Sequence, residues 1–380
     1  MTLECDGDSL DVHAWHPEPT DTAARPECCD EVGASPLIEV YDFFSGCGGT
    51  SAGLRKAGLR PVIAVDFDEG ALATYARNFP EATPILDDIR NLGTDQIEIH
   101  FEKERRNPVL MCACAPCQPF SKQNRHKDPS DKRASLLGHL GRFITRFRPE
   151  LLLIENVPGI KANVDGNPLS ELVGLLDELG YHHDAGIVMA HDYGVPQSRR
   201  RLLLVASLFG PISLPPPSHG SAEQPHLTVW DAIQRMPPLD AGEAHADVSN
   251  HQAANLSNLN LQRIKSSKQG GSWNDWPEAL RLACHADVDG YTDVYGRMDW
   301  NRPAPALTTR CISYSNGRFG HPEQDRAISV REAALLQTFD DDFEFVGNMA
   351  SMAKQIGNAV PVRLAEALGH MFQAHVRKFL

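Results

Sequence analysis

Short apolar runs that alternate with longer helix-forming segments are the feature that most constrains the fold of this 380-residue sequence. Each short apolar run is typical of a buried strand. Strands that alternate with helices predict an α/β sheet covered by helices on both faces, with ligands beyond the carboxyl ends of the strands. The expected strands are 37–44, 61–65, 83–86, 109–113, 151–155, 185–190 and 201–207, and the expected helices include 51–57, 70–78, 136–147 and 169–179.

The first strand–helix–strand unit contains a glycine-rich turn, Gly46-Cys47-Gly48-Gly49. Such a turn brings backbone N–H groups and a helix N-terminus together. Asp66 lies 20 positions after Gly46, where a nucleotide-binding fold places an acid that grips ribose hydroxyls. The dinucleotide fingerprint fails because Ser51 stands in place of its third glycine. The unit therefore favours a nucleoside without a pyrophosphate, such as S-adenosylmethionine, over a nicotinamide; a simple tight turn is the alternative.

A candidate nucleophile follows the strand expected at 109–113. Two prolines in Pro116-Cys117-Gln118-Pro119 impose an irregular backbone on it. A thiol held at the end of a buried strand is well placed for attack if positive or helix-terminal neighbours activate it. The alternatives are a small core residue and a metal knuckle, Cys112-x-Cys114-x-x-Cys117. The knuckle is too cramped for the usual zinc site and lacks a second ligand pair, so no metal site is expected.

The charge of the chain is concentrated at its start. The formal net charge of -14 argues against a protein that binds nucleic acid through bulk charge. Residues 1–36, however, hold nine acids and one base, and the remaining 41 acids and 35 bases give a net charge of about -6. A local basic cleft therefore stays open as an interpretation. We interpret 1–36 as a mobile acidic extension, since it lacks apolar periodicity.

The remaining composition indicates an ordinary globular protein of the cytoplasm. No apolar run is long enough to span a bilayer, and the N-terminus lacks the pattern of a secretion signal. Nine scattered cysteines do not form a disulfide framework, which fits a reducing compartment.

The chain also carries a series of short motifs in a fixed order. They are Asp42-Phe43-Phe44-Ser45-Gly46-Cys47-Gly48-Gly49, Val65-Asp66-Phe67-Asp68, Asp87-Asp88-Ile89, Pro116-Cys117-Gln118-Pro119-Phe120-Ser121, Glu155-Asn156-Val157, Tyr193-Gly194-Val195-Pro196-Gln197-Ser198-Arg199-Arg200-Arg201, Arg331-Glu332-Ala333-Ala334-Leu335-Leu336-Gln337-Thr338-Phe339 and Gln355-Ile356-Gly357-Asn358-Ala359-Val360-Pro361. In this order they closely resemble the DNA cytosine-5 methyltransferases, bacterial enzymes in particular. The resemblance implies a Rossmann-like sheet of the S-adenosylmethionine-dependent methyltransferases, in residues 37–208 plus 350–380. It also implies a smaller target-recognition domain with a hinge in residues 209–349.

The activity that the resemblance implies is methyl transfer to carbon 5 of a cytosine flipped out of duplex DNA. Carbon 5 is a poor nucleophile, and a thiolate added to carbon 6 converts the ring to a reactive enamine. Cys117 matches that thiolate, and Glu155 matches the carboxyl group at N3 and the amino group. Arg199 and Arg201 are expected on one face of a strand, where they polarise the base carbonyl oxygen, whereas Arg200 faces away.

The same resemblance implies a pocket for S-adenosylmethionine, which leaves as S-adenosyl-L-homocysteine. Phe44 and Phe67 are expected on the adenine faces, Asp66 on the ribose and Asp88 with Ile89 at the adenine edge. The full set is Phe44, Gly46, Cys47, Gly48, Gly49, Asp66, Phe67, Asp88, Ile89, Pro116, Leu136, Asn358 and Val360. The thiols of Cys47, Cys112 and Cys114 are expected to be structural. Ala113-Cys114-Ala115 stands where the family often has Gly-Gly-Pro, which affects the loop geometry rather than the reaction.

Two segments are expected to contact DNA. Residues 118–135 are basic and poor in apolar residues, and the resemblance implies a loop that closes over the duplex; a solvated loop is the alternative. Residues 256–276 interleave basic and aromatic side chains with glycines, which suits backbone and groove contacts. The residues chosen as DNA contacts are Gln118, Ser121, Lys122, Arg125, Arg263 and Lys268.

The expected partner is double-stranded DNA, and no contact with a membrane is expected. The protein is expected to be a monomer that associates with the bacterial nucleoid. A cognate restriction or defence system is a further expected partner. One alternative is a tRNA cytosine-5 methyltransferase of the same fold, although the Cys-Phe-Thr tripeptide of those relatives is absent after Glu155-Asn156-Val157. A second alternative is a catalytically inactive DNA-binding homologue, against which the intact Cys117 and Glu155 argue.

Overall fold

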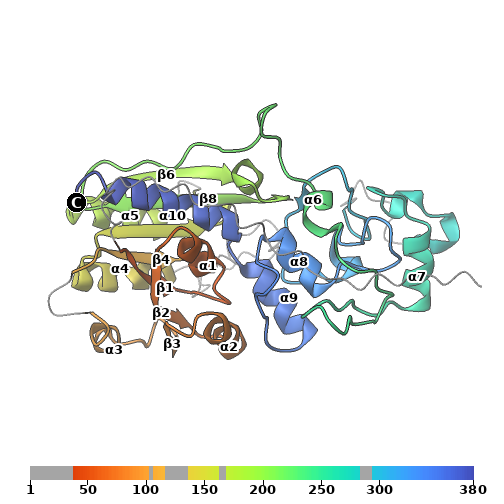
Figure 1. Cartoon of the computed structure of the whole chain (residues 1–380), viewed down its shortest axis with the longest axis horizontal. Helices are drawn as coiled ribbons and strands as arrows, with labels where there is room; N and C mark the ends of the chain where they lie inside the picture. Colours follow the sequence, from red (N-terminus) through yellow and green to blue (C-terminus); the bar gives the residue numbers. More distant parts are fainter. Residues whose placement is uncertain (1–36, 102–105, 116–135, 162–167, 283–292) are drawn as a thin grey trace, which may run out of the picture. The chain divides into compact units, whose positions relative to one another are not determined.

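One sheet organises the part of the chain that the computed structural model describes, namely residues 37–101, 106–115, 136–161, 168–282 and 293–380. Seven strands of these segments pair in the order β3-β2-β1-β4-β5-β8-β6 (Figure 1). They are β1 (Glu39–Phe43), β2 (Arg60–Asp66), β3 (Thr83–Leu86), β4 (Val109–Ala113), β5 (Leu151–Asn156), β6 (His182–Met189) and β8 (Arg200–Ser207). Each expected strand is present, with ends that differ from the prediction by three residues or fewer.

The sheet is parallel along most of its width and antiparallel at one edge. Strands β1 to β5 pair with one another only in parallel, whereas β8 is antiparallel to both β5 and β6. The parallel pairs need crossover connections, which α1 (Gly49–Lys56), α2 (Glu69–Asn78) and α4 (Leu136–Phe147) provide. The carboxyl ends of the parallel strands therefore meet at one edge of the sheet.

The remaining helices lie on or beyond this sheet. They are α3 (Thr94–Glu98), α5 (Pro168–Glu178), α6 (Val229–Ile233), α7 (Asn258–Lys265), α8 (Val330–Leu336), α9 (Met349–Asn358) and α10 (Val362–Val376). Two short strands, β7 (Gln197–Ser198) and β9 (Ala304–Pro305), pair in parallel and tie the segment before β8 to residues further along the chain. None of the described helices combines the length and the apolar character that a membrane-spanning helix requires.

Both faces of the sheet are buried, because alternate side chains of its central strands enter different apolar clusters. In β4, Met111 packs in the cluster that contains the apolar residues of α4 and α5, whereas Leu110 and Cys112 pack in the cluster that contains those of α10. The predicted α/β sheet with helices on both faces is confirmed.

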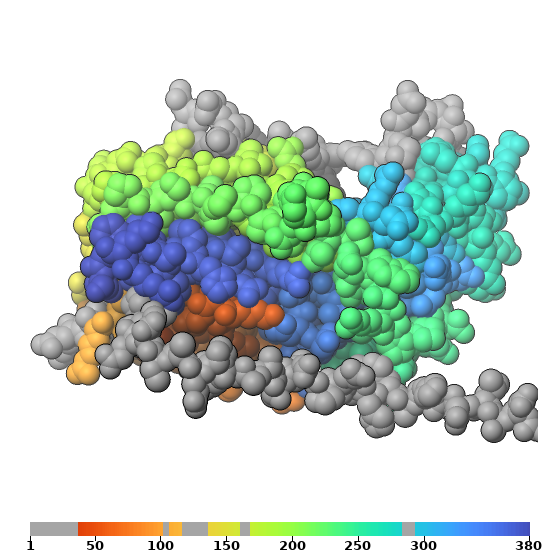
Figure 2. All heavy atoms as spheres, turned by 45° about the horizontal axis from the view of Figure 1, so that its top comes forward, coloured from red at the N-terminus to blue at the C-terminus, as the bar shows by residue number. Residues whose placement is uncertain are grey.

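The C-terminal helix packs on the first helix of the chain. Figures 1 and 2 both show α10, in dark blue, beside the red and orange N-terminal segments. Two glycines allow the close approach: a Cβ on Gly53 would lie 2.6 Å from the Cβ of Ala365, and a Cβ on Gly369 would lie 2.5 Å from the Cβ of Ala57. The division at residues 208 and 350 into two domains stays a prediction.

Candidate active site

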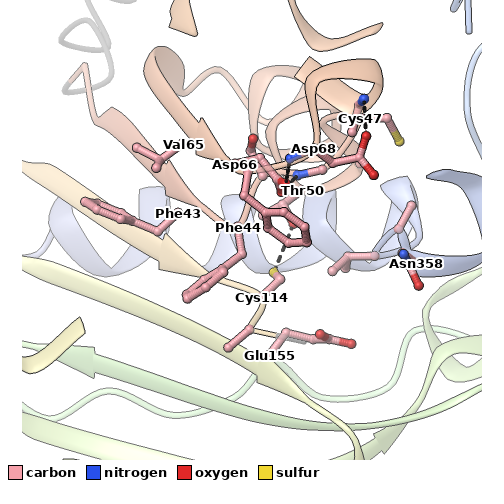
Figure 3. A pocket seen from close by; sticks show the side chains of 18 of the residues that line it. Phe43, Phe44, Cys47, Thr50, Val65, Asp66, Asp68, Cys114, Glu155 and Asn358 are labelled. Atoms are coloured by element: carbon pink, nitrogen blue, oxygen red, sulfur yellow. Dashed lines mark hydrogen bonds between the residues drawn. The ribbon is translucent and has the colours of Figure 1, made fainter. Parts of the chain in front are cut away.

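A cavity of about 490 Å³ lies at the carboxyl ends of the parallel strands (Figure 3). Its lining comes from the ends of β1, β2 and β5, from the residues just after β3 and β4, and from the last turn of α9. Its size is within the range of small-molecule sites, about 300–1,000 Å³. The sheet thus places a ligand site where the topology of an open α/β fold favours one.

The glycine turn forms one wall of this cavity. Gly46 has a φ of 54°, and a Cβ built on it would meet no atom within 4 Å, so the residue opens onto the cavity. Its N–H donates to Oδ2 of Asp66 over 2.8 Å, and the N–H of Asp68 donates to Oδ1 of Asp66 over 2.9 Å. Burial raises the pKa of Asp66. The turn and the carboxylate expected to hold the ribose are therefore locked together.

The other glycines of the turn have different roles. Gly48, expected at the cofactor, does not line the cavity; its φ is 96°, and a Cβ there would lie 2.5 Å from the ring of Phe79. Gly49 lines the cavity, and a Cβ there would lie 2.5 Å from the carbonyl oxygen of Val360. Gly49 therefore lets the C-terminal segment close one side of the pocket.

Apolar and acidic side chains lie at the end of the cavity expected to receive adenine. The residues that line this end include Phe44, Phe67, Ile89 and Leu136. Phe67 is 61% exposed, so its ring is accessible to a ligand that stacks on it. Asp88 accepts from Nε of Arg90 over 2.9 Å, and this hydrogen bond lowers the pKa of its carboxyl group. These are the positions that the sequence motifs selected.

Sequence reasoning missed an ion pair at the rim of the cavity. Nζ of Lys354 lies 2.6 Å from Oδ2 of Asp68, and both residues line the cavity. Burial raises the pKa of Asp68, but the hydrogen bond and charge of Lys354, together with backbone N–H donors such as that of Ala71, outweigh it, so the pKa lies below its ordinary value. The two residues are 286 positions apart, and no local pattern could have paired them.

Glu155 and Arg201 form an ion pair in the cavity wall. Glu155 is buried at the end of β5, and Arg201 is the second residue of the neighbouring β8. In the view of Figure 3, Asp66 and Asp68 lie at one end of the cavity and Glu155 at the other, with Cys114 between them. The pair combines a carboxylate and a guanidinium on the same side of the cavity, as expected for two groups that bind one base.

Arg199 also lines the cavity, but its terminal nitrogens are engaged by the protein. Nη1 donates to the carbonyl oxygen of Leu307 over 2.9 Å, and Nη2 donates to that of Gly357 over 3.0 Å. Its Nε is buried without a hydrogen-bond partner among the described residues. Burial, assisted by the nearby charge of Arg201, lowers the pKa of Arg199. Arg199 therefore joins three chain segments behind the cavity, and Arg200 is exposed, as expected.

The described cysteines near the cavity have the surroundings of structural thiols. Burial raises the pKa of Cys47 to about 12 and raises the pKa of Cys112 and Cys114. Cys114 lines the cavity with its Sγ 3.3 Å from Oγ1 of Thr50 (Figure 3). The residues Pro116, Cys117, Gln118, Ser121, Lys122 and Arg125 lie outside the described part of the chain.

The two described residues chosen as DNA contacts differ in exposure. Arg263 is buried: its Nε donates to the carbonyl oxygen of Leu280, and its guanidinium lies 5.1 Å from the ring centroid of Trp276. These contacts are those of a residue that holds the local core, because its donors and its planar face are already occupied. Lys268 is exposed and remains available to a phosphate.

A buried carboxyl group lies behind the glycine turn. Asp42, in β1, accepts from Oγ of Ser51 over 2.7 Å, and Ser51 accepts in turn from the hydroxyl group of Tyr75 over 2.9 Å. The second oxygen, Oδ1, has no hydrogen-bond partner among the described residues. Burial raises the pKa of Asp42 to about 7. This chain of hydroxyl groups links β1, α1 and α2 under the turn.

Comparison with known proteins gives a consistent result. The family model of the C-5 cytosine-specific DNA methylases matches residues 38–374. The type II methylase M.HgiDII of Herpetosiphon aurantiacus is 38% identical over 348 residues, which cover 90% of this chain and 95% of the relative. The type II methyltransferase M1.HphI of Haemophilus parahaemolyticus is 33% identical over 334 residues, which cover 87% and 85% of the two chains.

Solved structures show the same fold. A protein from an E. coli prophage, described as a DNA modification methyltransferase, matches with a TM-score of 0.69 and 24% identity, over 90% of this chain and 99% of that one. The Dnmt2 methyltransferase of S. pombe matches with a TM-score of 0.58 and 19% identity, over 90% and 99% of the two chains. The predicted Rossmann-like methyltransferase sheet is therefore confirmed.

Proposed function

This chain belongs to the family of C-5 cytosine-specific DNA methylases, and from that membership we propose its donor, its target and its catalytic residues. The donor is S-adenosylmethionine. The target is a cytosine that the enzyme flips out of duplex DNA within a specific sequence. The reaction passes through a covalent bond between Cys117 and carbon 6 of that cytosine.

The cavity supports the assignment of the donor. Gly46 opens onto it without a side chain, Asp66 presents a carboxylate fixed by two backbone N–H groups, and Phe44 and Phe67 supply aromatic faces. These groups fit a methionine moiety, a ribose and an adenine. When bound, S-adenosylmethionine supplies an electrophilic methyl group. The protein's own contribution is to orient that group and to exclude water from it.

The observation that carries the proposal is the Glu155–Arg201 pair in the wall of the same cavity. Ala115, which also lines the cavity, is only two positions before Cys117. The thiolate of Cys117 adds to carbon 6 while Glu155 interacts with N3 and the amino group. Arg201 stabilises the charge that develops on the carbonyl oxygen. After methylation, loss of the proton on carbon 5 allows the thiolate to leave.

Arg199 supports the reaction mainly by holding neighbouring chain segments in place. Its hydrogen bonds to Leu307 and Gly357 fix the strand that carries Arg201 against residues beyond the sheet.

Sequence specificity belongs to the segment that includes the exposed Lys268. Flipping a base costs a few kcal/mol, which phosphate and pocket contacts offset. The type II methylases among its relatives favour a role beside a restriction enzyme, in the cytoplasm at the nucleoid.

The test is methyl transfer from S-adenosylmethionine with a tritiated methyl group. We expect label in 5-methyldeoxycytidine when the chain is incubated with duplex DNA of mixed sequence, and none with tRNA. Duplexes that contain 5-fluorocytosine should form an adduct with the chain that resists denaturation, because fluorine cannot leave as the proton does. Label in tRNA alone would support the tRNA alternative and contradict the proposal.

Matched serine variants identify the nucleophile. Cys117→Ser should abolish both methyl transfer and the adduct, whereas Cys28→Ser, outside the region matched by the family, should retain both. A wild-type chain that binds DNA and S-adenosylmethionine without transferring label would instead be the inactive homologue. Label that persists in Cys117→Ser would show that another residue attacks the base.

A further inference from the structure

Two imidazoles and one carboxylate converge outside the cavity described above. His191 and Asp192 lie in η3 (Ala190–Tyr193), between β6 and β7, and His226 lies two residues before the N-cap of α6. Each of the three offers one ligand atom, and these atoms all lie within 4.8 Å of one another. None of the three lines the cavity. The cluster is therefore distinct from the proposed methyl-transfer site.

Both imidazoles approach the same carboxylate oxygen. Nε2 of His226 lies 3.0 Å from Oδ1 of Asp192, and Nε2 of His191 lies 3.4 Å from that atom. The two ring centroids are 4.3 Å apart. Two nitrogen atoms and one oxygen atom thus lie within 4.8 Å of one another, close enough for one small cation to bind all three.

Backbone contacts hold the two chain segments together independently of any ion. The N–H groups of Ser218 and His219 donate to the carbonyl oxygen of Asp192 over 2.8 and 2.9 Å. The hydroxyl group of Tyr193 donates to the carbonyl oxygen of Pro215 over 2.8 Å. Gly194, with a φ of 73°, accommodates the ring of His219, which would lie 2.7 Å from a Cβ at that position. The ligands are therefore positioned in advance, which lowers the entropic cost of binding.

The surroundings of His191 disfavour its charged form. Burial and the neighbouring charge of His226 lower the pKa of His191, so its ring stays neutral to a lower pH than a free histidine. Metal ions bind imidazole only in the neutral form. Nδ1 of His191 is buried and has no hydrogen-bond partner among the described residues.

We propose that His191, Asp192 and His226 bind one divalent transition-metal ion of the zinc class, through both Nε2 atoms and Oδ1. Two imidazoles select such ions over magnesium and calcium, which prefer ligand sets made only of oxygen. Three protein ligands leave a fourth position for water. The ion fastens the segment that leads into α6 to the η3 turn that precedes β7 and β8. Its role is structural, since the cluster is outside the cavity.

Cobalt titration tests this site, because Co²⁺ replaces zinc and absorbs visible light. The full chain, freed of metal by a chelator, should bind one equivalent of Co²⁺ with the spectrum of nitrogen and oxygen ligands, without a thiolate charge-transfer band. His226→Gln and Asp192→Asn each remove a direct ligand and should weaken binding by at least about 10- to 100-fold, the loss that removal of an outer-shell partner already causes. Added Co²⁺ should raise the unfolding temperature of the wild type more than that of either variant.

A matched control separates the cluster from other surface histidines. His183 contacts Asp177, with Nε2 to Oδ1 2.9 Å apart, but within the described part of the chain no second imidazole joins that pair to form a three-ligand cluster. His183→Gln should therefore keep full Co²⁺ affinity. The side chain of His226 is 35% exposed, so His226→Gln should fold, as its unfolding midpoint in urea without metal will show. Equal Co²⁺ binding by the wild type and His226→Gln, an equal loss in His183→Gln, or a thiolate band would overturn the proposal.

Discussion

At the scale of the single residue, Gly46 tests the assignment of the cavity most directly. Among the described residues it is one of four left-handed glycines, with Gly58, Gly180 and Gly242, whose Cβ would meet open space or an ordinary contact, and only Gly46 of these lines the cavity. Gly58, with a φ of 87°, is the matched position at the end of α1. An alanine at either position adds about 1–2 kcal/mol of backbone strain.

Gly46→Ala should therefore weaken binding of S-adenosylmethionine in a way that Gly58→Ala does not. The added methyl group projects into the cavity, and overpacking of about 1–3 kcal/mol corresponds to roughly 10- to 100-fold in the dissociation constant. Calorimetric titration of both variants with S-adenosyl-L-homocysteine measures the difference. Equal affinities in the two variants would show that the ligand does not occupy this wall.

The buried carboxyl group of Asp42 predicts a pH dependence of stability. Its pKa is about 7 in the folded chain, against an ordinary value of 3.8, so the folded state binds the extra proton between these values. The contribution of Asp42 to the free energy of unfolding is therefore greatest below pH 4 and falls as the pH rises to 7. The loss is on the order of 4 kcal/mol, since each pKa unit corresponds to about 1.4 kcal/mol.

Asp42→Asn removes this charge and keeps an oxygen that can accept from Ser51. The free energy of unfolding of the variant, relative to the wild type, should rise from pH 4 to pH 7 and stay level above it. Urea unfolding at several pH values provides the measurement, and the comparison cancels groups that both proteins share. A difference that does not change with pH would mean that Asp42 is ionised in the folded chain.

Single residues show where sequence reasoning succeeds and where it fails. Asp66 and Glu155 reach the cavity because each ends a predicted strand, and the strand ends meet at one edge. The burial of Arg263 could not be foreseen, since the aromatic rings that enclose its guanidinium lie 13 and 32 positions further along the chain. Arg263, which was chosen as a DNA contact, is instead buried with these rings in a small core, whereas the role of the exposed Lys268 in the same segment stays a prediction.

At the scale of the element, the contact between α1 and α10 depends on Gly53. A Cβ there would overlap the carbonyl oxygen of Val362 and lie 2.6 Å from the backbone N of Glu366, and backbone atoms cannot move aside cheaply. Gly53→Ala should therefore destabilise the chain by about 2–3 kcal/mol despite the better helix propensity of alanine.

Gly174 provides the opposite case within α5. Nothing lies within 4 Å of its Cβ position, so Gly174→Ala should gain about 0.5–1 kcal/mol from helix propensity alone. Urea unfolding of the two alanine variants measures the expected loss of stability in Gly53→Ala and the expected gain in Gly174→Ala. If Gly53→Ala also stabilised the chain, the close packing of the two helices would be disproved.

The elements themselves were largely predictable, but their directions were not. The strand and helix boundaries of the first unit follow from apolar runs and a glycine turn, which are local signals. The antiparallel pairing of β8 with β5 and β6 has no local signal, because a buried strand has the same composition in either direction. The short helix α3, with five residues, was also missed.

At the scale of the whole molecule, the acidic residues 1–36 should oppose non-specific binding to DNA. Their removal changes the formal net charge from -14 to about -6, because they hold nine acids and one base. A chain that begins at residue 37 should bind non-cognate duplex about 3- to 10-fold more tightly at low salt. The gain should vanish near 0.5 M salt, where charges more than about 4–5 Å apart are screened.

Fluorescence anisotropy with a labelled duplex that lacks cytosine measures this affinity across a salt series. Replacement of residues 1–36 by an uncharged segment of equal length is the control for bulk. A difference that persists at high salt would assign the effect to something other than charge.

Long-range juxtapositions limit what any sequence pattern can reveal at this scale. His191 and His226 are 35 positions apart, and the expectation of no metal site rested on the cysteines alone. The family resemblance implied that the C-terminal segment returns to the first domain, but not that it packs on α1. The periodicity of α10 indicates which face is apolar but not what that face covers.

The position of the last helix has a consequence for how the protein is made. Because residues 354–360 complete the cavity wall and α10 rests on α1, the proposed donor pocket is unfinished until residues 354–376 have been translated. A nascent chain that has not reached these residues, or one released before them by a premature stop, presents the glycine turn without its far wall. We expect such fragments to leave the genome unmarked, so that modification requires residues 354–376.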